Sequence, residues 1–535
     1  MRLYPLSLYL LLSSMLPLFL FGCATGGVQP IPESGSLPAT ASATAQAATS
    51  SASGAGLPDL ETVSELELSL EESILLMLQN NRGLAIEQLN PVIAGAYAQI
   101  ERGRFDPELF ASWQQDEEQS SEVSRSTEDV FSVKGTDERA SVGLRKEFAS
   151  GTDIEADIAH QRSISSRTPE QQEARLGLSV TQSLLRGFGP GVNLISVRQA
   201  ELEVEASTYE LRGYTEALMA ECEIAYWRYV LAREEIAIFE RSLEVAIRQR
   251  DDIVEQIEVG ALAENDAAAA RAEVARREQD LIEAQSNLEN RRLRLLRLID
   301  PNALHRSDLE LTTASSPHRE ALPIEDIADR VALAARMRPD LNEARLRHEQ
   351  NRLETVRTRN GLLPRLDLFI DLGKTGYADA FTDSFQNLED DTYEVTGGIR
   401  LSHYLGNRAA RGRDLAARED WEQSRLSIEN LEDLVRLDVH LAINEVERYR
   451  RQITASAVTR AFQEQSLQAE EERFNVGAGT ALLVAQAQRD LLASQIAEID
   501  AIVQYRIALV DLSSRRAASW SGVGFPLAIE SRCLC

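Results

Sequence analysis

The sequence predicts a mainly α-helical protein made of two tandem copies, each with short strands and a long antiparallel coiled-coil pair of helices. Helix-breaking residues are scarce, since 535 residues include only 29 Gly and 16 Pro. Val259-Gly260-Ala261 recurs as Val476-Gly477-Ala478, with the same offset that separates Gly189 from Gly406. Apolar residues also recur every three or four positions in both copies, which is typical of a coiled coil.

The first residues predict export from the cytoplasm. Residues 1–22 contain an apolar stretch that two prolines interrupt, which is typical of a signal peptide rather than a spanning helix. Cys23 after Gly22 resembles a bacterial lipobox, which implies cleavage before Cys23 and lipidation of this residue. The alternative is an ordinary signal peptide whose apolar part ends near a cysteine. Residues 23–60, the lipidated Cys and a segment rich in Ala and Ser, are predicted to form a flexible tether.

The first copy is assigned to residues 65–300. A short helix is expected over about 70–79, strands over about 108–185, and a coiled-coil hairpin over about 193–299. The hairpin turns at Val259-Gly260, and its long helix would extend about 90–100 Å at 1.5 Å per residue. Residues 301–322 are expected to form a linker.

The second copy is assigned to residues 323–515, with a tail over 516–535. Strands are expected over about 365–402 and the coiled-coil hairpin over about 409–514. The two copies share one apolar seam, in which every residue of the first copy has an apolar partner 217 positions later. The seam pairs are Leu211 and Ile428, Tyr214 and Leu431, Leu218 and Val435, Cys222 and Val439, Ala225 and Ala442, Tyr229 and Val446, Ala232 and Tyr449, and Ile236 and Ile453.

The strand segments alternate between aliphatic and charged residues, as in the run of residues 365–372. This alternation suits a lipid-facing sheet with a wet lumen, and a half-buried soluble sheet explains it equally well. The first copy has about 40 extra residues between Pro107 and Gly189, which are expected to add a hairpin turning at residues 149–151. The hairpin either widens the sheet to six strands or lengthens exposed loops. The acidic, Ser-rich runs 116–129 and 161–173 are predicted to be loops.

Composition excludes several functional classes. A formal net charge of −29 argues against a nucleic-acid-binding protein, because phosphate contacts need clustered Lys and Arg. Four Cys cannot form a disulfide framework in a chain of this length. The six His are scattered without metal-ligand spacing, and no nucleophile motif occurs, so we expect no enzyme, no metal and no cofactor. Cys222 lies on the seam, where packing is expected; no role is assigned to Cys533 and Cys535.

Taken in order, these features resemble the TolC-type outer membrane efflux protein family, in its lipoprotein branch of outer membrane factors. The resemblance covers about residues 65–515 and rests on the two copies, each with a helix, a Pro, strands, a long helix, a Val-Gly turn and a return helix. It also includes the run Gln-Ser-Leu-Leu-Arg-Gly-Phe-Gly at residues 182–189. The resemblance implies a homotrimeric channel with a transmembrane β-barrel in the bacterial outer membrane and a helical tunnel through the periplasm.

The resemblance also implies partners and sites. The partners would be outer membrane lipid, a periplasmic adaptor protein and an inner-membrane transporter of a tripartite efflux or type I secretion system. The sites would be periplasmic tips at Val259, Gly260, Asp266, Val476 and Gly477, and a barrel–tunnel junction at Pro107, Gly189, Pro364 and Gly406. Asp266 is equally explained as a solvated residue at a helix start, and Leu483 and Gln486 stand where family members carry acids. The alternative function is a lipid-anchored periplasmic coiled-coil scaffold without a barrel.

Overall fold

The computed structural model describes residues 65–123, 130–260, 264–305, 309–318, 321 and 323–516. They belong to one compact unit, Asp59–Cys535. The predicted signal peptide, the lipidation site Cys23, the tether, and Cys533 and Cys535 of the tail lie outside the described residues.

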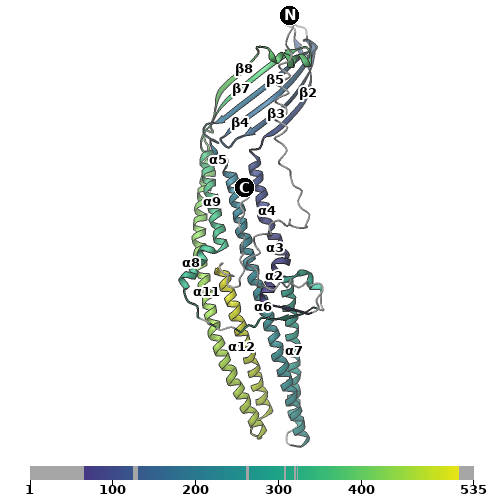
Figure 1. Ribbon diagram of the computed structural model, residues 1–535, viewed down its shortest axis with the longest axis vertical. Helices are drawn as coiled ribbons and strands as arrows, with labels where there is room; N and C mark the ends of the chain where they lie inside the picture. Colours follow the sequence, from purple (N-terminus) through teal and green to yellow (C-terminus); the bar gives the residue numbers. More distant parts are fainter. Residues whose placement is uncertain are drawn as a thin grey trace, which may run out of the picture. The chain divides into compact units, whose positions relative to one another are not determined.

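Four long helices form two antiparallel hairpins, as the seam predicts (Figure 1). The first hairpin consists of α6 (Ile195–Glu258) and α7 (Glu264–Ile299), and the second of α11 (Arg408–Asn475) and α12 (Ala481–Arg516). The seam residues Val435, Val439 and Val446 of α11 are buried against Tyr505 and Leu512 of α12. The hydrophobic effect therefore stabilises the second hairpin along the stripe that the sequence repeats.

Shorter helices precede each set of strands. Those of the first copy are α2 (Leu70–Asn80), α3 (Arg82–Glu87) and α4 (Leu89–Gly103), and those of the second are α8 (Ile327–Met337) and α9 (Pro339–Gly361). Ser69 begins α2 with a capping box, in which its hydroxyl accepts a hydrogen bond from the Glu72 amide at 3.2 Å. The short turns are α5 (Pro190–Asn193), η1 (Pro301–His305), α10 (Phe381–Gln386) and η2 (Asn387–Glu389).

The helices next to the large sheet form a layer with two open edges. Helix α11 packs on α9, α9 on α6, and α6 on α4. Helices α11 and α4 are therefore the outermost members of this layer, as Figure 1 shows. Of the described helices, none combines the length and apolar character that a membrane crossing requires.

A small parallel sheet pairs the start of the first copy with the linker, near the middle of α6. It consists of β1 (Glu65–Leu68) and β6 (Glu310–Thr313). The Tyr226 hydroxyl of α6 donates a hydrogen bond to the Leu68 carbonyl at 3.0 Å, and Tyr229 donates to the Leu311 carbonyl at 2.6 Å. These buried hydroxyls satisfy backbone acceptors that would otherwise lose their water partners, so they fix the small sheet on α6.

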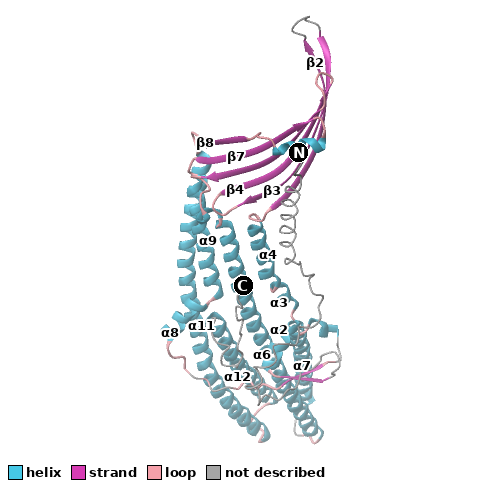
Figure 2. Cartoon of the chain, turned by 45° about the horizontal axis from the view of Figure 1, so that its top comes forward, coloured by secondary structure: helices cyan, strands magenta, loops and turns pink. Residues whose placement is uncertain are grey.

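The large sheet has six antiparallel strands, in the order β2-β3-β4-β5-β7-β8 (Figure 2). The first copy supplies four of them and the second copy two; the strands are β2 (Glu108–Val123), β3 (Val130–Glu147), β4 (Thr152–Ser165), β5 (Gln171–Ser183), β7 (Arg365–Ala378) and β8 (Glu394–Ser402). The extra hairpin turns between β3 and β4 at residues 148–151, and it widens the sheet to six strands.

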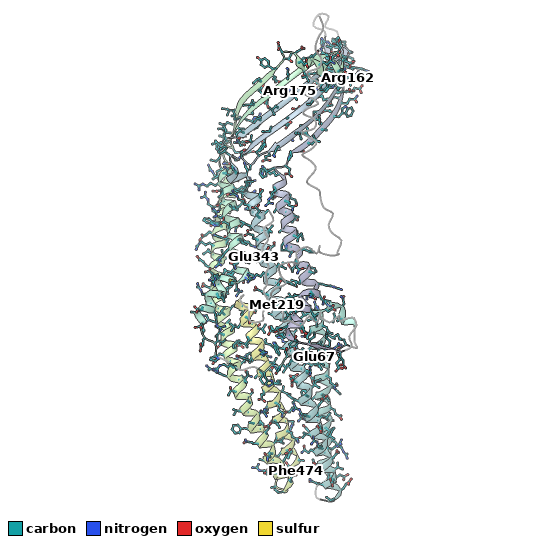
Figure 3. The ribbon with its side chains drawn as sticks, in the orientation of Figure 1. Glu67, Arg162, Arg175, Met219, Glu343 and Phe474 are labelled. Carbon is teal, nitrogen blue, oxygen red and sulfur yellow. The ribbon has the colours of Figure 1, made fainter. Side chains whose placement is uncertain are left out.

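The prediction that runs 116–129 and 161–173 are loops is wrong for much of both runs. Residues 116–123 continue β2, residues 161–165 continue β4, and residues 171–173 begin β5. Ion pairs accompany the ladder hydrogen bonds there. Arg139 Nη1 of β3 lies 3.1 Å from Asp116 Oδ2 of β2, and Nε of Arg162 in β4 (Figure 3) lies 2.6 Å from Oε1 of Glu170, the residue before β5. Pairing with neighbouring strands thus outweighs the low strand propensity of acidic residues.

Candidate functional site

One face of the large sheet carries an unbroken apolar row. The register aligns one exposed apolar residue from every strand: Leu109, Leu144, Ala156, Leu178, Leu372 and Val395. Flanking rows add further aliphatic residues, among them Val142, Ile158, Leu176, Ile154, Val180 and Ile370. We call these twelve residues the apolar band. A band this wide on an exposed sheet face needs an apolar partner, because water solvates it poorly.

The opposite face of the same strands is charged. Arg145 lies between two carboxylates there, with its Nε 2.8 Å from Glu155 Oε2 and its Nη1 3.9 Å from Glu108 Oε2. Arg175 Nη2 lies 3.1 Å from Glu394 Oε2. Acidic residues on this face (Glu108, Asp116, Glu118, Asp137, Glu147, Asp153, Glu155, Asp157, Glu173, Asp367, Asp371 and Glu394) outnumber the arginines (Arg139, Arg145, Arg175, Arg365 and Arg400). The sheet is therefore amphipathic, with one apolar face and one charged face, as lipid-facing sheets are.

Each end of the sheet is an open edge among the described residues, where β2 pairs only with β3 and β8 only with β7. Helix α4 leads directly into β2, and β8 leads directly into α11. The molecule thus has two long lateral edges, each made of an edge strand and an outermost helix. We call them the β2/α4 edge and the β8/α11 edge. Long unpaired strand edges are templates for pairing with another chain.

Apolar side chains continue both edges along the helices. On α3 and α4, exposed residues step by three or four: Ile86, Leu89, Ile93, Tyr97 and Ile100. On α11 the exposed leucines are Leu415, Leu426, Leu434, Leu437 and Leu441. Tyr97 is 63% and Leu415 60% exposed, so neither stripe is covered within one copy. A stripe at this spacing is the seam of a coiled coil that lacks its partner helix.

The two hairpin tips have the same backbone geometry. Helix α6 ends before Val259, and Gly260 follows with φ +77°. Helix α11 ends before Val476, and Gly477 follows with φ +73°. Glycine adopts this left-handed conformation without the steric cost of a side chain, so it ends each helix and reverses the chain. Val259 and Val476 are 75% and 78% exposed, so both tips present an apolar side chain to their surroundings.

The remaining predicted tip residue, Asp266, lies in the first turns of α7, and its side chain is outside the described residues. Leu483 is exposed near the start of α12, so the second tip presents an aliphatic group there.

The predicted junction residues lie where the large sheet joins the helices. The Gly189 amide donates to the Ser150 carbonyl of the β3–β4 turn at 3.0 Å, and the Arg186 amide donates to the Pro364 carbonyl at 3.3 Å. Gly151 leaves no room for a side chain, since an added Cβ would lie 2.2 Å from the Gly187 carbonyl oxygen. On the other side of the first copy, Pro107 follows the turn that ends α4, where Arg104 forms an ion pair with Glu147.

The junction of the second copy differs from that of the first in its backbone conformation. Gly189 has φ +89°, whereas at the equivalent position in the second copy Gly406 is not left-handed and the next residue, Asn407, has φ +40°. The Asn407 side-chain amide donates to the Leu362 carbonyl at 3.2 Å, which secures the loop against the end of α9. Asparagine tolerates left-handed backbone better than most residues. The sequence analysis did not predict a role for Asn407, because it considered only the prolines and glycines of the junction.

Cys222 is buried in the seam, and its burial raises the pKa of the thiol to about 12. A thiol held protonated is a poor nucleophile. We therefore expect Cys222 to react with a maleimide only after denaturation, as measured by mass spectrometry with and without guanidinium. Fast labelling of the folded chain would contradict this packing. Among the described residues no group of His, Cys, Asp and Glu is arranged to hold a metal ion.

Comparisons with known proteins agree with this geometry. Residues 331–515 match the model of the outer membrane efflux protein family. No curated protein matches the chain. The outer-membrane channel OprN has a similar structure, with a TM-score of 0.64 and 19% identity over 84% of this chain and 90% of that one. The Campylobacter jejuni outer membrane channel CmeC has a TM-score of 0.62 and 16% identity over 84% and 85%.

The open state of the Neisseria gonorrhoeae outer membrane channel MtrE has a TM-score of 0.60 and 19% identity over 84% of this chain and 89% of that one. These likenesses show a common fold along nearly the whole described unit. The resemblance that the tandem copies indicate is thus confirmed. Residues 331–515 thus match the outer membrane efflux protein family, and the fold of the described residues is that of the outer membrane channels.

Proposed function

We propose that the protein is the outer membrane channel of a tripartite efflux or type I secretion system. It would passively export substrate that an inner-membrane transporter passes on through a periplasmic adaptor. The observation that carries the proposal is the pair of complementary lateral edges on one copy, the β2/α4 edge and the β8/α11 edge. The family match and the similar channel structures support the same function.

The edges favour a closed ring of copies. Strands β2 and β8 run in opposite directions, so β8 of one copy can pair with β2 of the next and continue the antiparallel sheet. An interface between two different edges is heterologous, and it forms a ring when the rotation between copies closes. Lipid offers no hydrogen-bond partner to an open strand edge, so a membrane-inserted sheet of this kind must close on itself. Three copies, as the family resemblance implies, would provide that closure.

The sheet would cross the outer membrane with the apolar band toward lipid and its acidic face toward the lumen. All six strands of each copy carry the band. The added hairpin would therefore enlarge the circumference of the closed sheet and would not lengthen an exposed loop. The helices would continue the conduit into the periplasm, and a lipid on Cys23 would add a second membrane attachment.

The hairpin tips would contact the adaptor. The exposed Val259 and Val476 beside Gly260 and Gly477 supply apolar contact on rigid turns, and Asp266 would lie beside the first of them. The junction at Pro107, Gly189, Pro364 and Gly406 would join the membrane sheet to the tunnel.

A cross-linking experiment tests the ring. Tyr97 lies six residues before the end of α4, and Leu415 lies seven residues after the start of α11, so both side chains are about 10 Å from the helix ends next to the sheet. The variant carrying Tyr97→Cys and Leu415→Cys is expected to form disulfide-linked dimers and trimers on oxidation in membranes. Each single variant serves as control and should stay monomeric in a denaturing gel. A double variant without cross-links that still conducts ions would refute this edge pairing.

A further inference from the structure

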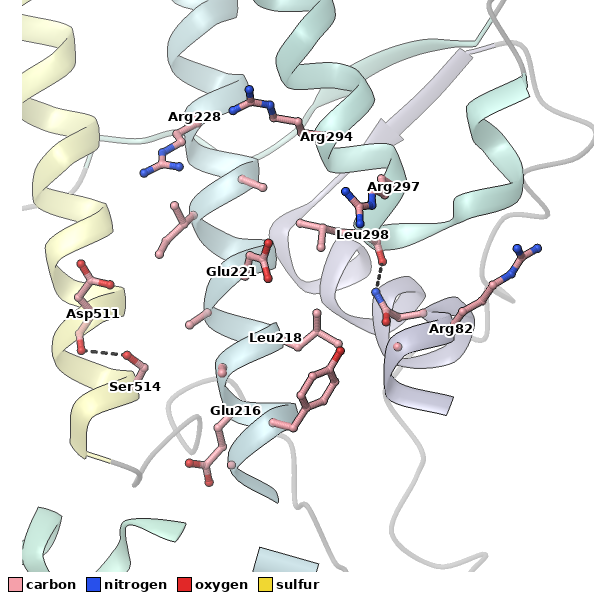
Figure 4. Close-up of a pocket in the computed structure, with 18 of the residues that line it drawn as sticks. Arg82, Glu216, Leu218, Glu221, Arg228, Arg294, Arg297, Leu298, Asp511 and Ser514 are labelled. Carbon is pink, nitrogen blue, oxygen red and sulfur yellow. Dashed lines mark hydrogen bonds between the residues drawn. The ribbon is translucent and has the colours of Figure 1, made fainter. Parts of the chain in front are cut away.

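An arginine-rich cavity lies between the first hairpin, the shorter helices and the end of α12 (Figure 4). Its volume is about 1240 Å³, and residues of α3, α6, α7, α9 and α12 line it. It is separate from the apolar band and from the hairpin tips. Four of the arginines that line it lie on the first hairpin: Arg228 on α6, and Arg291, Arg294 and Arg297 on α7.

Among the described residues, carboxylates act on these arginines only at longer range, Glu235 on Arg291 and Asp511 on Arg228. None of them forms an ion pair or donates a hydrogen bond within the part of the chain that the structure describes. Other helical arginines pair with a carboxylate one turn away, as Arg292 of the same helix does with Glu289 at 2.7 Å. In a chain with 85 acidic and 56 basic residues, unpaired arginines are not explained by a shortage of acids.

The acids that line the cavity do not neutralise the cluster. Glu216 is bound by Arg212 at 2.8 Å, and Asp340 is bound by Arg338 at 2.6 Å. Glu221 and Asp511 remain, and they lie on α6 and α12 (Figure 4). The cavity therefore carries an excess of positive charge inside a strongly acidic protein.

The arginines are also close enough to repel one another. Residues 291, 294 and 297 are three apart, so they lie on one face of α7 beside Arg228 of the neighbouring helix. Burial, and then repulsion by Arg228 and Arg294, lower the pKa of Arg291. This arrangement costs free energy in the free protein, and a bound anion would recover it.

We propose that this cavity binds an organic anion that carries more than one phosphate or carboxylate group. The planar guanidinium groups can each bind such a group through two parallel hydrogen bonds. Tyr214, Leu218 and Leu304 line other parts of the cavity and supply contact for the apolar body of the ligand. All residues that line the cavity belong to one copy of the chain, so the proposed anion site does not depend on the proposed channel function.

Calorimetry on the full chain in detergent, with inorganic pyrophosphate as the probe, tests the proposal. Saturable binding is expected in about 0.15 M KCl, where long-range attraction is screened. The variant Arg291→Gln/Arg294→Gln should weaken it at least about tenfold, because charge-assisted hydrogen bonds are lost. The control Arg448→Gln/Arg451→Gln removes the same charge from α11 and should leave the affinity nearly unchanged.

A second arm identifies the source of the anion. Vesicles of phosphatidylcholine with phosphatidic acid replace pyrophosphate, and binding that depends on Arg291 and Arg294 would support a lipid headgroup as the ligand. Binding of neither probe, or equal weakening in both pairs of variants, would overturn the proposal. So would a variant that binds pyrophosphate normally but loses its oligomers, because the cluster would then serve contact with a neighbouring copy.

Discussion

Replacing Leu178 with arginine is expected to abolish insertion of the protein into membranes. Leu178 lies on the interior strand β5, in the row of the apolar band that crosses all six strands. An arginine at the middle of a lipid-facing strand costs about 2–4 kcal/mol, and every copy in a ring would bear this cost. Flotation of refolded protein with lipid vesicles measures the insertion, and the variant should remain in the unbound fraction.

The neighbouring residue provides a matched control. Ser179 lies on the opposite face of the same strand, in register with Glu155 and Asp371. Arginine in its place would face water and these two carboxylates, so Ser179→Arg should insert like the wild type. Insertion of both variants, or of neither, would mean that the two faces of the sheet do not meet different solvents.

Replacing Tyr97 with aspartate is expected to leave the protein as single copies. Tyr97 belongs to the apolar stripe on α3 and α4, and burial of a large apolar side chain contributes about 1.5–3 kcal/mol per interface. A buried unpaired carboxylate adds a further penalty. Size-exclusion chromatography with light scattering in detergent gives the mass of the assembly, which should fall from that of a trimer to that of a monomer.

Gln99→Asp is the control for this charge. Gln99 is exposed on the same helix and lies roughly 200° around the helix axis from Tyr97, so its replacement introduces the same charge on a side that faces away from the expected interface. It should assemble normally. A monomeric Gln99→Asp variant would indicate a general effect of charge on α4, and a trimeric Tyr97→Asp variant would place the interface elsewhere.

The long helices could be predicted from the sequence because their determinants are local. The repeated seam around Val435 and Val439 fixes the hairpin faces, and Gly260 and Gly477 fix the turns. The strands of the acidic runs could not be predicted in the same way. Asp116, for example, lies in a strand beside Arg139 of the neighbouring strand, whose position depends on the register of the sheet.

Two features of the functional surface were open to sequence reasoning and were missed. The spacing of Ile86, Leu89, Ile93, Tyr97 and Ile100 is a coiled-coil stripe as clear as that of the seam, and it indicates an external partner because it lacks one inside the chain. The cavity arginines at 291, 294 and 297 were equally visible at one-turn spacing. Their lack of carboxylate partners, however, is a property of the folded helices alone.

Ion conductance of the purified protein in a planar lipid bilayer tests the central claim most directly. If neighbouring copies join the β2/α4 edge to the β8/α11 edge, the assembly encloses a water-filled passage. Stable single-channel steps should then appear with the wild type and disappear with Tyr97→Asp. Trimers that bind the bilayer but never conduct would contradict the account, and they would favour a lipid-anchored scaffold in its place.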